Sequence, residues 1–101
     1  MVNPVLKRAL HTWGEQAQMM MVVEEMSELM KEILKNVNRG KDNLAEIIEE
    51  TADVEIMLEQ LKENYQIADK VEAYKSEKIK LIERRLDDWD KTHAAWKDNR
   101  K

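Results

Sequence analysis

The sequence predicts an all-α protein, a helical bundle of three long helices and one short N-terminal helix. Of its 101 residues, 48 are Ala, Glu, Lys, Leu or Arg, close to the share that marks long helices. Only two Gly and one Pro are available to end helices and form turns. Apolar residues also recur at spacings of three and four along the chain, as they do on one face of a helix. A β-sandwich, a collagen and a disulfide scaffold fit these counts poorly.

The first two helices are separated by a glycine. Pro4 suits the first turn of a short helix that runs to about Ala9 or Leu10, and Gly14 offers the break. A long helix is then expected from Glu15 to Val37, ended by Gly40 as a left-handed C-cap. Its apolar stripe consists of Met19, Val23, Met26, Met30, Ile33 and Val37.

The next two helices follow from the same reasoning. Asp42 or Asn43 can cap a third helix that runs to about Glu63. Its stripe has the most regular spacing in the chain: Leu44, Ile47, Thr51, Val54, Leu58, Leu61 and Tyr65. A fourth helix begins near Ile67 or Asp69 and has apolar residues as far as Trp89. We therefore expect one domain over residues 1–89 and a polar extension over residues 90–101.

Charge and hydropathy exclude several classes of partner. The formal net charge of -4 disfavours a nucleic acid polymer, which normally requires a basic face. The absence of Cys removes disulfides and thiolate metal sites. The longest apolar run, residues 19–23, has five residues where a membrane span needs about 20. We expect a soluble, cytoplasmic protein with no membrane partner.

The apolar surface of the middle helices is wide for a small chain. Residues 19–23 point in every direction around their helix, so some of them would stay in contact with water in a monomer. Burial against a second copy is the simplest remedy, and we expect a homodimer. The alternative is that this methionine-rich segment only fills the core.

Acidic side chains form a stripe on each of the two middle helices. On the second helix the stripe is Glu25, Glu28 and Glu32, and on the third it is Glu46, Glu50 and Asp53. If the two helices pack antiparallel, the stripes approach one another. Like charges that meet in this way are unfavourable, and a divalent cation offsets the repulsion. Carboxylate oxygens without His or Cys are the ligands that Mg²⁺ or Mn²⁺ prefers.

Two short motifs resemble a known enzyme family. Glu24-Glu25-Met26-Ser27-Glu28, followed after 21 residues by Glu50-Thr51-Ala52-Asp53, resemble the signature of the MazG-like all-α nucleoside triphosphate pyrophosphatases. The resemblance extends over about residues 11–86 and includes the connection Arg39-Gly40-Lys41-Asp42-Asn43. It implies a helical subunit that dimerises, sometimes into tetramers, and hydrolyses (d)NTP to (d)NMP and pyrophosphate with Mg²⁺.

The resemblance also implies roles for individual residues. By position, Glu25, Glu28, Glu50 and Asp53 match the family's Mg²⁺ ligands, and Glu24 matches the leading glutamate of the motif. Hydrolysis would proceed through a water activated by the metal, with a nearby glutamate taking the proton. No side-chain nucleophile is required.

Four residues are candidates for contacts with the substrate: Trp13, Gln18, Lys31 and Met57. Trp13 offers a stacking face for the base, and its alternative role is to close the core between the first two helices. Lys31 lies beside the acidic stripe, where it could meet phosphate, as could Lys35. Met57 stands where some relatives have an aromatic residue, one turn after the aspartate.

Other interpretations remain open for the same residues. Charged helix faces are usually solvated, and Lys31, Lys35 and Lys62 could form ordinary surface ion pairs with these acids. The chain could also be a non-catalytic helical bundle that serves only in oligomerisation or protein interaction. A di-iron carboxylate bundle needs Glu-x-x-His pairs, and only Asp90 to His93 has a similar spacing.

Overall fold

The computed structural model describes residues 2–93, and 89% of them are helical, with no strand in that range. Four helices follow in order: α1 (Pro4–Trp13), α2 (Glu15–Arg39), α3 (Leu44–Tyr65) and α4 (Ala68–Thr92). This confirms the all-α prediction of three long helices and a short first one. No helix in the described part of the chain is both long and apolar enough to cross a membrane.

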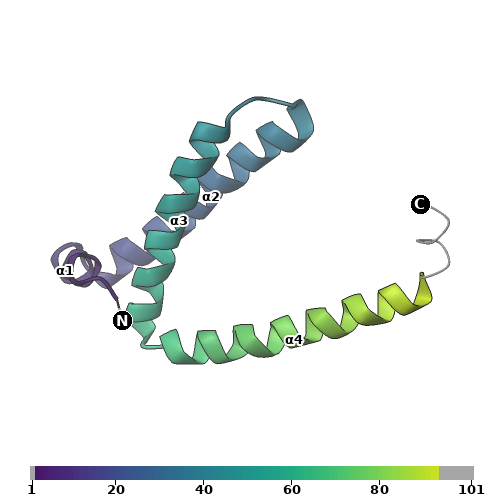
Figure 1. The fold of residues 1–101 in the computed structure, drawn as a ribbon. Helices are drawn as coiled ribbons and strands as arrows, with labels where there is room; N and C mark the ends of the chain where they lie inside the picture. The colour runs from purple at the N-terminus through teal and green to yellow at the C-terminus, as the bar shows by residue number, and fades with distance from the viewer. Residues whose placement is uncertain (1, 94–101) are drawn as a thin grey trace. The chain divides into compact units, whose positions relative to one another are not determined.

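The chain divides into two compact units, Met1–Ile67 and Ala68–Lys101. In the first unit, α2 and α3 lie side by side as a hairpin, and α1 packs on both of them (Figure 1). An ion pair of 3.7 Å between Lys7 and Glu63 links α1 to α3. The hairpin is the element that brings the two acidic stripes together.

The second unit is described as far as residue 93 and contains α4. None of the residues in this 25-residue helix is buried. Trp89 stacks on His93 with ring centroids 3.6 Å apart, and Lys78 lies over the ring of Tyr74. The helix continues three residues beyond Trp89, so the boundary expected at residue 89 lies inside it. The rest of the expected extension, residues 94–101, is outside the described part of the chain.

Local signals set the helix ends. Asn3 caps α1 by accepting a hydrogen bond from the Val5 amide, and α1 runs on to Trp13, past the expected end at Ala9 or Leu10, because the break comes at Gly14. Gly40 takes the left-handed conformation expected of a C-cap, with φ of 61°. Gln66 takes the same conformation after α3, which extends that helix to Tyr65.

The core of the first unit is small. Among the described residues, the buried apolar side chains are Leu10 and Val22, and the buried polar ones are Gln18, Asn43 and Gln60. Trp13 is 66% exposed, so the alternative in which it closes the core is wrong. Large apolar side chains are exposed along α2, at Met20, Val23, Met26, Met30, Ile33, Leu34 and Val37. The same holds on α3 at Leu44, Ile48, Ile56, Leu58 and Tyr65.

Candidate metal centre

Three carboxylates from two helices converge at the middle of the hairpin. Glu25 of α2 meets Glu50 and Asp53 of α3, and one oxygen from each lies within 4.8 Å of the other two. Glu50 and Asp53 reach the same point because residues three apart lie on one face of a helix. All three side chains are half-buried. The predicted approach of the two acidic stripes is therefore confirmed for these three residues.

The electrostatics of this acidic cluster, defined as Glu25, Glu50 and Asp53, are unfavourable without a cation. Burial raises the pKa of Glu25 above its ordinary value, and the nearby charges of Asp53, Glu50 and Glu28 raise it further. A hydrogen bond to Glu50 adds to the shift in pKa, because two carboxyl groups can share one only when a proton is present. The protein thus holds negative charge where it is poorly solvated.

One oxygen of the cluster finds no N–H or hydroxyl donor among the described residues. Glu50 Oε2 is buried and accepts no hydrogen bond from the described residues. Buried polar atoms are normally paired, so this oxygen is available to a water molecule or to a cation. An unpaired anionic oxygen beside two further carboxylates is a donor set suited to a hard divalent cation such as Mg²⁺ or Mn²⁺. The residues present therefore fit the metal that the sequence predicts.

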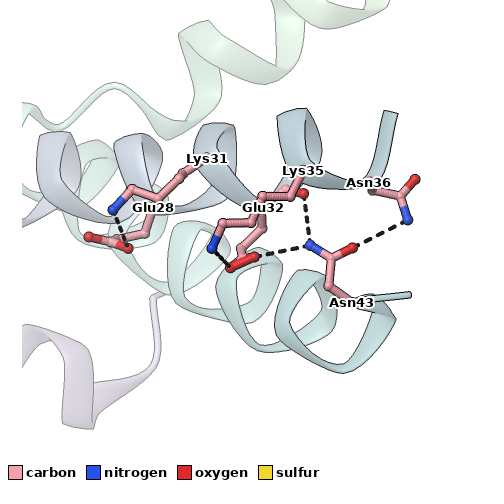
Figure 2. A network of polar contacts seen from close by, with 6 residues as sticks. All are labelled: Glu28, Lys31, Glu32, Lys35, Asn36 and Asn43. Carbon is pink, nitrogen blue, oxygen red and sulfur yellow. Dashed lines mark hydrogen bonds and ion pairs between the residues drawn. The ribbon is translucent and has the colours of Figure 1, made fainter. Parts of the chain in front are cut away.

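Glu28, the fourth expected ligand, is not part of the acidic cluster. Its side chain is exposed, and Glu28 Oε2 lies 3.9 Å from Lys31 Nζ (Figure 2). It remains near enough to Glu25 for its charge to raise the Glu25 pKa. Lys35 pairs with Glu32 at 3.2 Å in the same way, and Lys62 with Glu59 at 2.8 Å. The ordinary ion pairs considered for these lysines are thus present.

Glu24 is not part of the acidic cluster. Its side chain is exposed, and its backbone carbonyl accepts a hydrogen bond of 2.7 Å from Ser27 Oγ. A residue one position from Glu25 is rotated by about 100° around the helix, which accounts for the difference.

The structure brings the four substrate candidates to different environments. Trp13 lines a hollow of about 260 Å³ on α1 with Val5, Arg8, Ala9 and Thr12. Lys31 lines another, of about 330 Å³, with Leu34, Lys35, Asn38 and Arg39. Met57 is half-buried, one turn after Asp53. Gln18 is buried and donates a 2.6 Å hydrogen bond to Gln60 Oε1, so one of its two amide N–H groups is already paired.

Asn43 has a role that the sequence did not indicate. It occupies the N-cap position of α3, but its side chain makes no capping bond among the described residues. Instead its amide nitrogen donates to the Glu32 backbone oxygen at 2.9 Å and to Glu32 Oε2 at 3.0 Å (Figure 2). Asn36 donates in turn to Asn43 Oδ1 at 3.3 Å. These bonds tie the start of α3 to α2.

The bonds to Glu32 make the stability of the hairpin sensitive to acid. Hydrogen bonds from Asn43 and Lys35 hold the pKa of Glu32 below its ordinary value of 4.5. A lowered folded-state pKa means that the ionised carboxylate stabilises the fold above pH 4.5 and that this contribution is lost as pH falls through the folded-state pKa. We expect urea midpoints for wild type and Glu32→Gln to differ at pH 7 and to approach one another as pH falls below 4.5. A difference in urea midpoint that does not change with pH would contradict this role of the Glu32 carboxylate.

Comparison of the chain with models of protein families, with curated proteins and with solved structures finds no match.

Proposed function

We propose that this chain is a Mg²⁺-dependent nucleoside triphosphate pyrophosphohydrolase of the MazG-like group, which converts (d)NTP to (d)NMP and pyrophosphate. The main support is the convergence of Glu25, Glu50 and Asp53, three of the four residues at ligand positions of the motif. Glu25 on α2 precedes Glu50 and Asp53, which share α3, by 25 and 28 residues. A chance run of glutamates on one solvated helix does not account for their meeting.

In this proposal the acidic residues bind the cation and accept a proton from the attacking water. Glu25, Glu50 and Asp53 hold the cation, and Glu28 turns from Lys31 to complete the set. A bound Mg²⁺ would neutralise triphosphate charge and polarise the attacking water. Glu50 Oε2, which has no donor among the described residues, accepts the water's proton or a ligand contact. Glu24 is a second candidate for the general base.

In this proposal the substrate contacts come from the candidates named by the motif. Lys31 exchanges its exposed, 3.9 Å pairing with Glu28 for a phosphate oxygen. Trp13 offers its exposed face to the base, and Met57 borders the site one turn from Asp53. Gln18 acts through Gln60 rather than by a direct contact. We place the activity in the cytoplasm, where nucleotide pools lie.

The proposal is tested by incubating the purified chain with canonical and modified triphosphates in Mg²⁺ or in EDTA. Monophosphate and pyrophosphate in equal amounts, formed only with the metal, are expected. Release of inorganic phosphate instead would place the cut at another bond and contradict the reaction. Release of neither product from any nucleotide would favour the alternative, a non-catalytic bundle that serves only in oligomerisation or protein interaction.

A second copy is expected to cover the exposed apolar surface of α2 and α3. The buried apolar side chains Leu10 and Val22 form too small a core for a domain of this length, while side chains such as Met30 and Ile48 are each 61% exposed. Sedimentation equilibrium should report a dimer or tetramer, and Met30→Lys should shift it toward the monomer. Exposed Glu55→Lys, on the same hairpin, is the control. A monomer at every concentration would exclude this assembly.

A further inference from the structure

Polar residues recur along the interface between α2 and α3 at a fixed interval. On α2, Gln18, Glu25 and Glu32 are each seven residues apart, about two helical turns or roughly 10.5 Å. They therefore lie close to one face of the helix, and each meets a polar partner on α3 or at its N-cap. We call the three resulting contacts polar layers. The outer two are hydrogen-bonded, and the middle one is the acidic cluster.

The spacing on α3 matches the spacing on α2. Glu50 follows Asn43 by seven residues, and Asp53 precedes Gln60 by seven. Because α2 and α3 run antiparallel, the Asn43 bond to Glu32 brings Glu50 level with Glu25, two turns away. The Gln18 bond to Gln60 brings Asp53 level with Glu25 from the other end. Each outer layer thus aligns one of the two acids of α3 with the acid of α2.

A slip of α3 along α2 would also shift half-buried apolar side chains such as Leu29, Ile47 and Val54, but apolar contacts can form again in a new register, whereas paired amides cannot. The acids of the middle layer repel one another and favour separation. Among the described residues the buried apolar side chains are Leu10 and Val22, and Leu10 belongs to α1 rather than to the hairpin. By contrast Gln18, Asn43 and Gln60 are 5%, 7% and 2% exposed, and a slip by one turn would leave all three buried amides without their partners. Unpaired buried amides are costly, so the outer layers specify the register.

We propose that Asn43 and the Gln18–Gln60 pair are positioning residues that set the register of α3 on α2 and so hold Glu50 and Asp53 against Glu25. They do not touch the reacting atoms. This inference rests on the proposed function only in its consequence, which is the affinity of the cluster for a divalent ion. The register itself is a property of the metal-free chain.

The test measures Mn²⁺ affinity and register separately in the full chain. Free Mn²⁺ is followed by electron paramagnetic resonance during titration, well below the unfolding temperature. In a second experiment, nitroxide labels replace the exposed Ser27 and Ala52, and the labelled chain is diluted with unlabelled chain before the distance distribution is measured. For Asn43→Ala we expect a dissociation constant at least tenfold higher and a shifted or broadened distribution. Exposed Asn38→Ala is the control and should match wild type.

A second variant keeps the fold where Asn43→Ala only destabilises it. Replacing Gln18 and Gln60 together by Leu removes both buried amides and leaves neither unpaired, so the unfolding temperature should stay the same or rise. Mn²⁺ should nevertheless bind several-fold more weakly, because apolar side chains pack in more than one register. A purely structural role predicts that affinity and stability change in the same direction.

The outcomes separate the two proposals. Wild-type affinity and wild-type distances in both variants overturn the positioning role. Weaker binding with unchanged distances overturns it as well, since the residues would then act in some other way. If wild type binds no Mn²⁺ but the distances shift in both variants, the positioning role stands and the proposed function fails.

Discussion

Replacing Asp53 by Asn is expected to abolish pyrophosphate release while making the metal-free protein more stable. Asn keeps the size of the side chain but removes a charge from a group of oxygens that lie within 4.8 Å of one another. A neutral amide is a poorer ligand for Mg²⁺, so turnover should fall by at least about a hundredfold. The relief of repulsion should raise the free energy of unfolding by on the order of 1 kcal/mol. Turnover with Mg²⁺ and urea unfolding in EDTA measure the two effects.

The opposite signs of these effects separate a metal site from an ordinary surface. Glu55→Gln is the matched control, because Glu55 is exposed two residues further along α3 and its replacement removes the same charge. It should leave both turnover and stability close to wild type. Full activity in Asp53→Asn would show that the ligand assignment is wrong. A loss of activity together with a loss of stability would indicate that Asp53 supports the fold.

Glu28→Ala asks whether the fourth expected ligand belongs to the site. In the metal-free structure Glu28 is exposed and lies 3.9 Å from Lys31, outside the cluster. If it joins the other acids on metal binding, its replacement abolishes turnover with little change in metal-free stability. Glu28 is the residue at which the motif and the observed geometry differ most.

The helices could be predicted from the sequence because their signals are local. Spacing of three and four sets the apolar stripes, and Gly14 and Gly40 are the breaks at which α1 and α2 end. The end of α3 could not be predicted as well, since Gln66 takes a left-handed conformation that glycine usually adopts. The exposure of Trp13 depends on how α1 packs on the hairpin, which no local pattern specifies.

Part of the candidate site followed from sequence in the same way. Two acids three residues apart on each helix predict convergence, and Glu25, Glu50 and Asp53 do converge. Glu28 is not part of this group and lies 3.9 Å from Lys31, one turn further on. Asn43 and Gln60 were missed, since an amide at a helix start or in a polar helix has many ordinary uses. Only the seven-residue interval shared with the acids could have indicated them.

Mg²⁺ is expected to raise the unfolding temperature of the wild-type chain, and more so as pH rises. An ion that binds only the folded state at a hundred times its dissociation constant stabilises it by about 2.7 kcal/mol. The pKa of Glu25 is raised above 4.5 in the folded state, so the stability associated with its proton is present below pH 4.5 and is lost as pH rises through the folded-state pKa. In EDTA the protein should therefore lose stability above pH 4.5.

Metal and proton compete for the same oxygens, so the effect of Mg²⁺ on the unfolding temperature depends on pH. As the proton leaves Glu25 the ion can replace it, so the difference in unfolding temperature between Mg²⁺ and EDTA should grow from pH 4.5 to pH 7. Glu25→Gln removes the titrating group and should flatten both curves while stabilising the chain in EDTA. Glu24→Gln is the control, since the neighbouring Glu24 is exposed and should leave the curves unchanged. Equal unfolding temperatures with Mg²⁺ and EDTA at pH 7 would mean that the three acids repel one another without holding an ion.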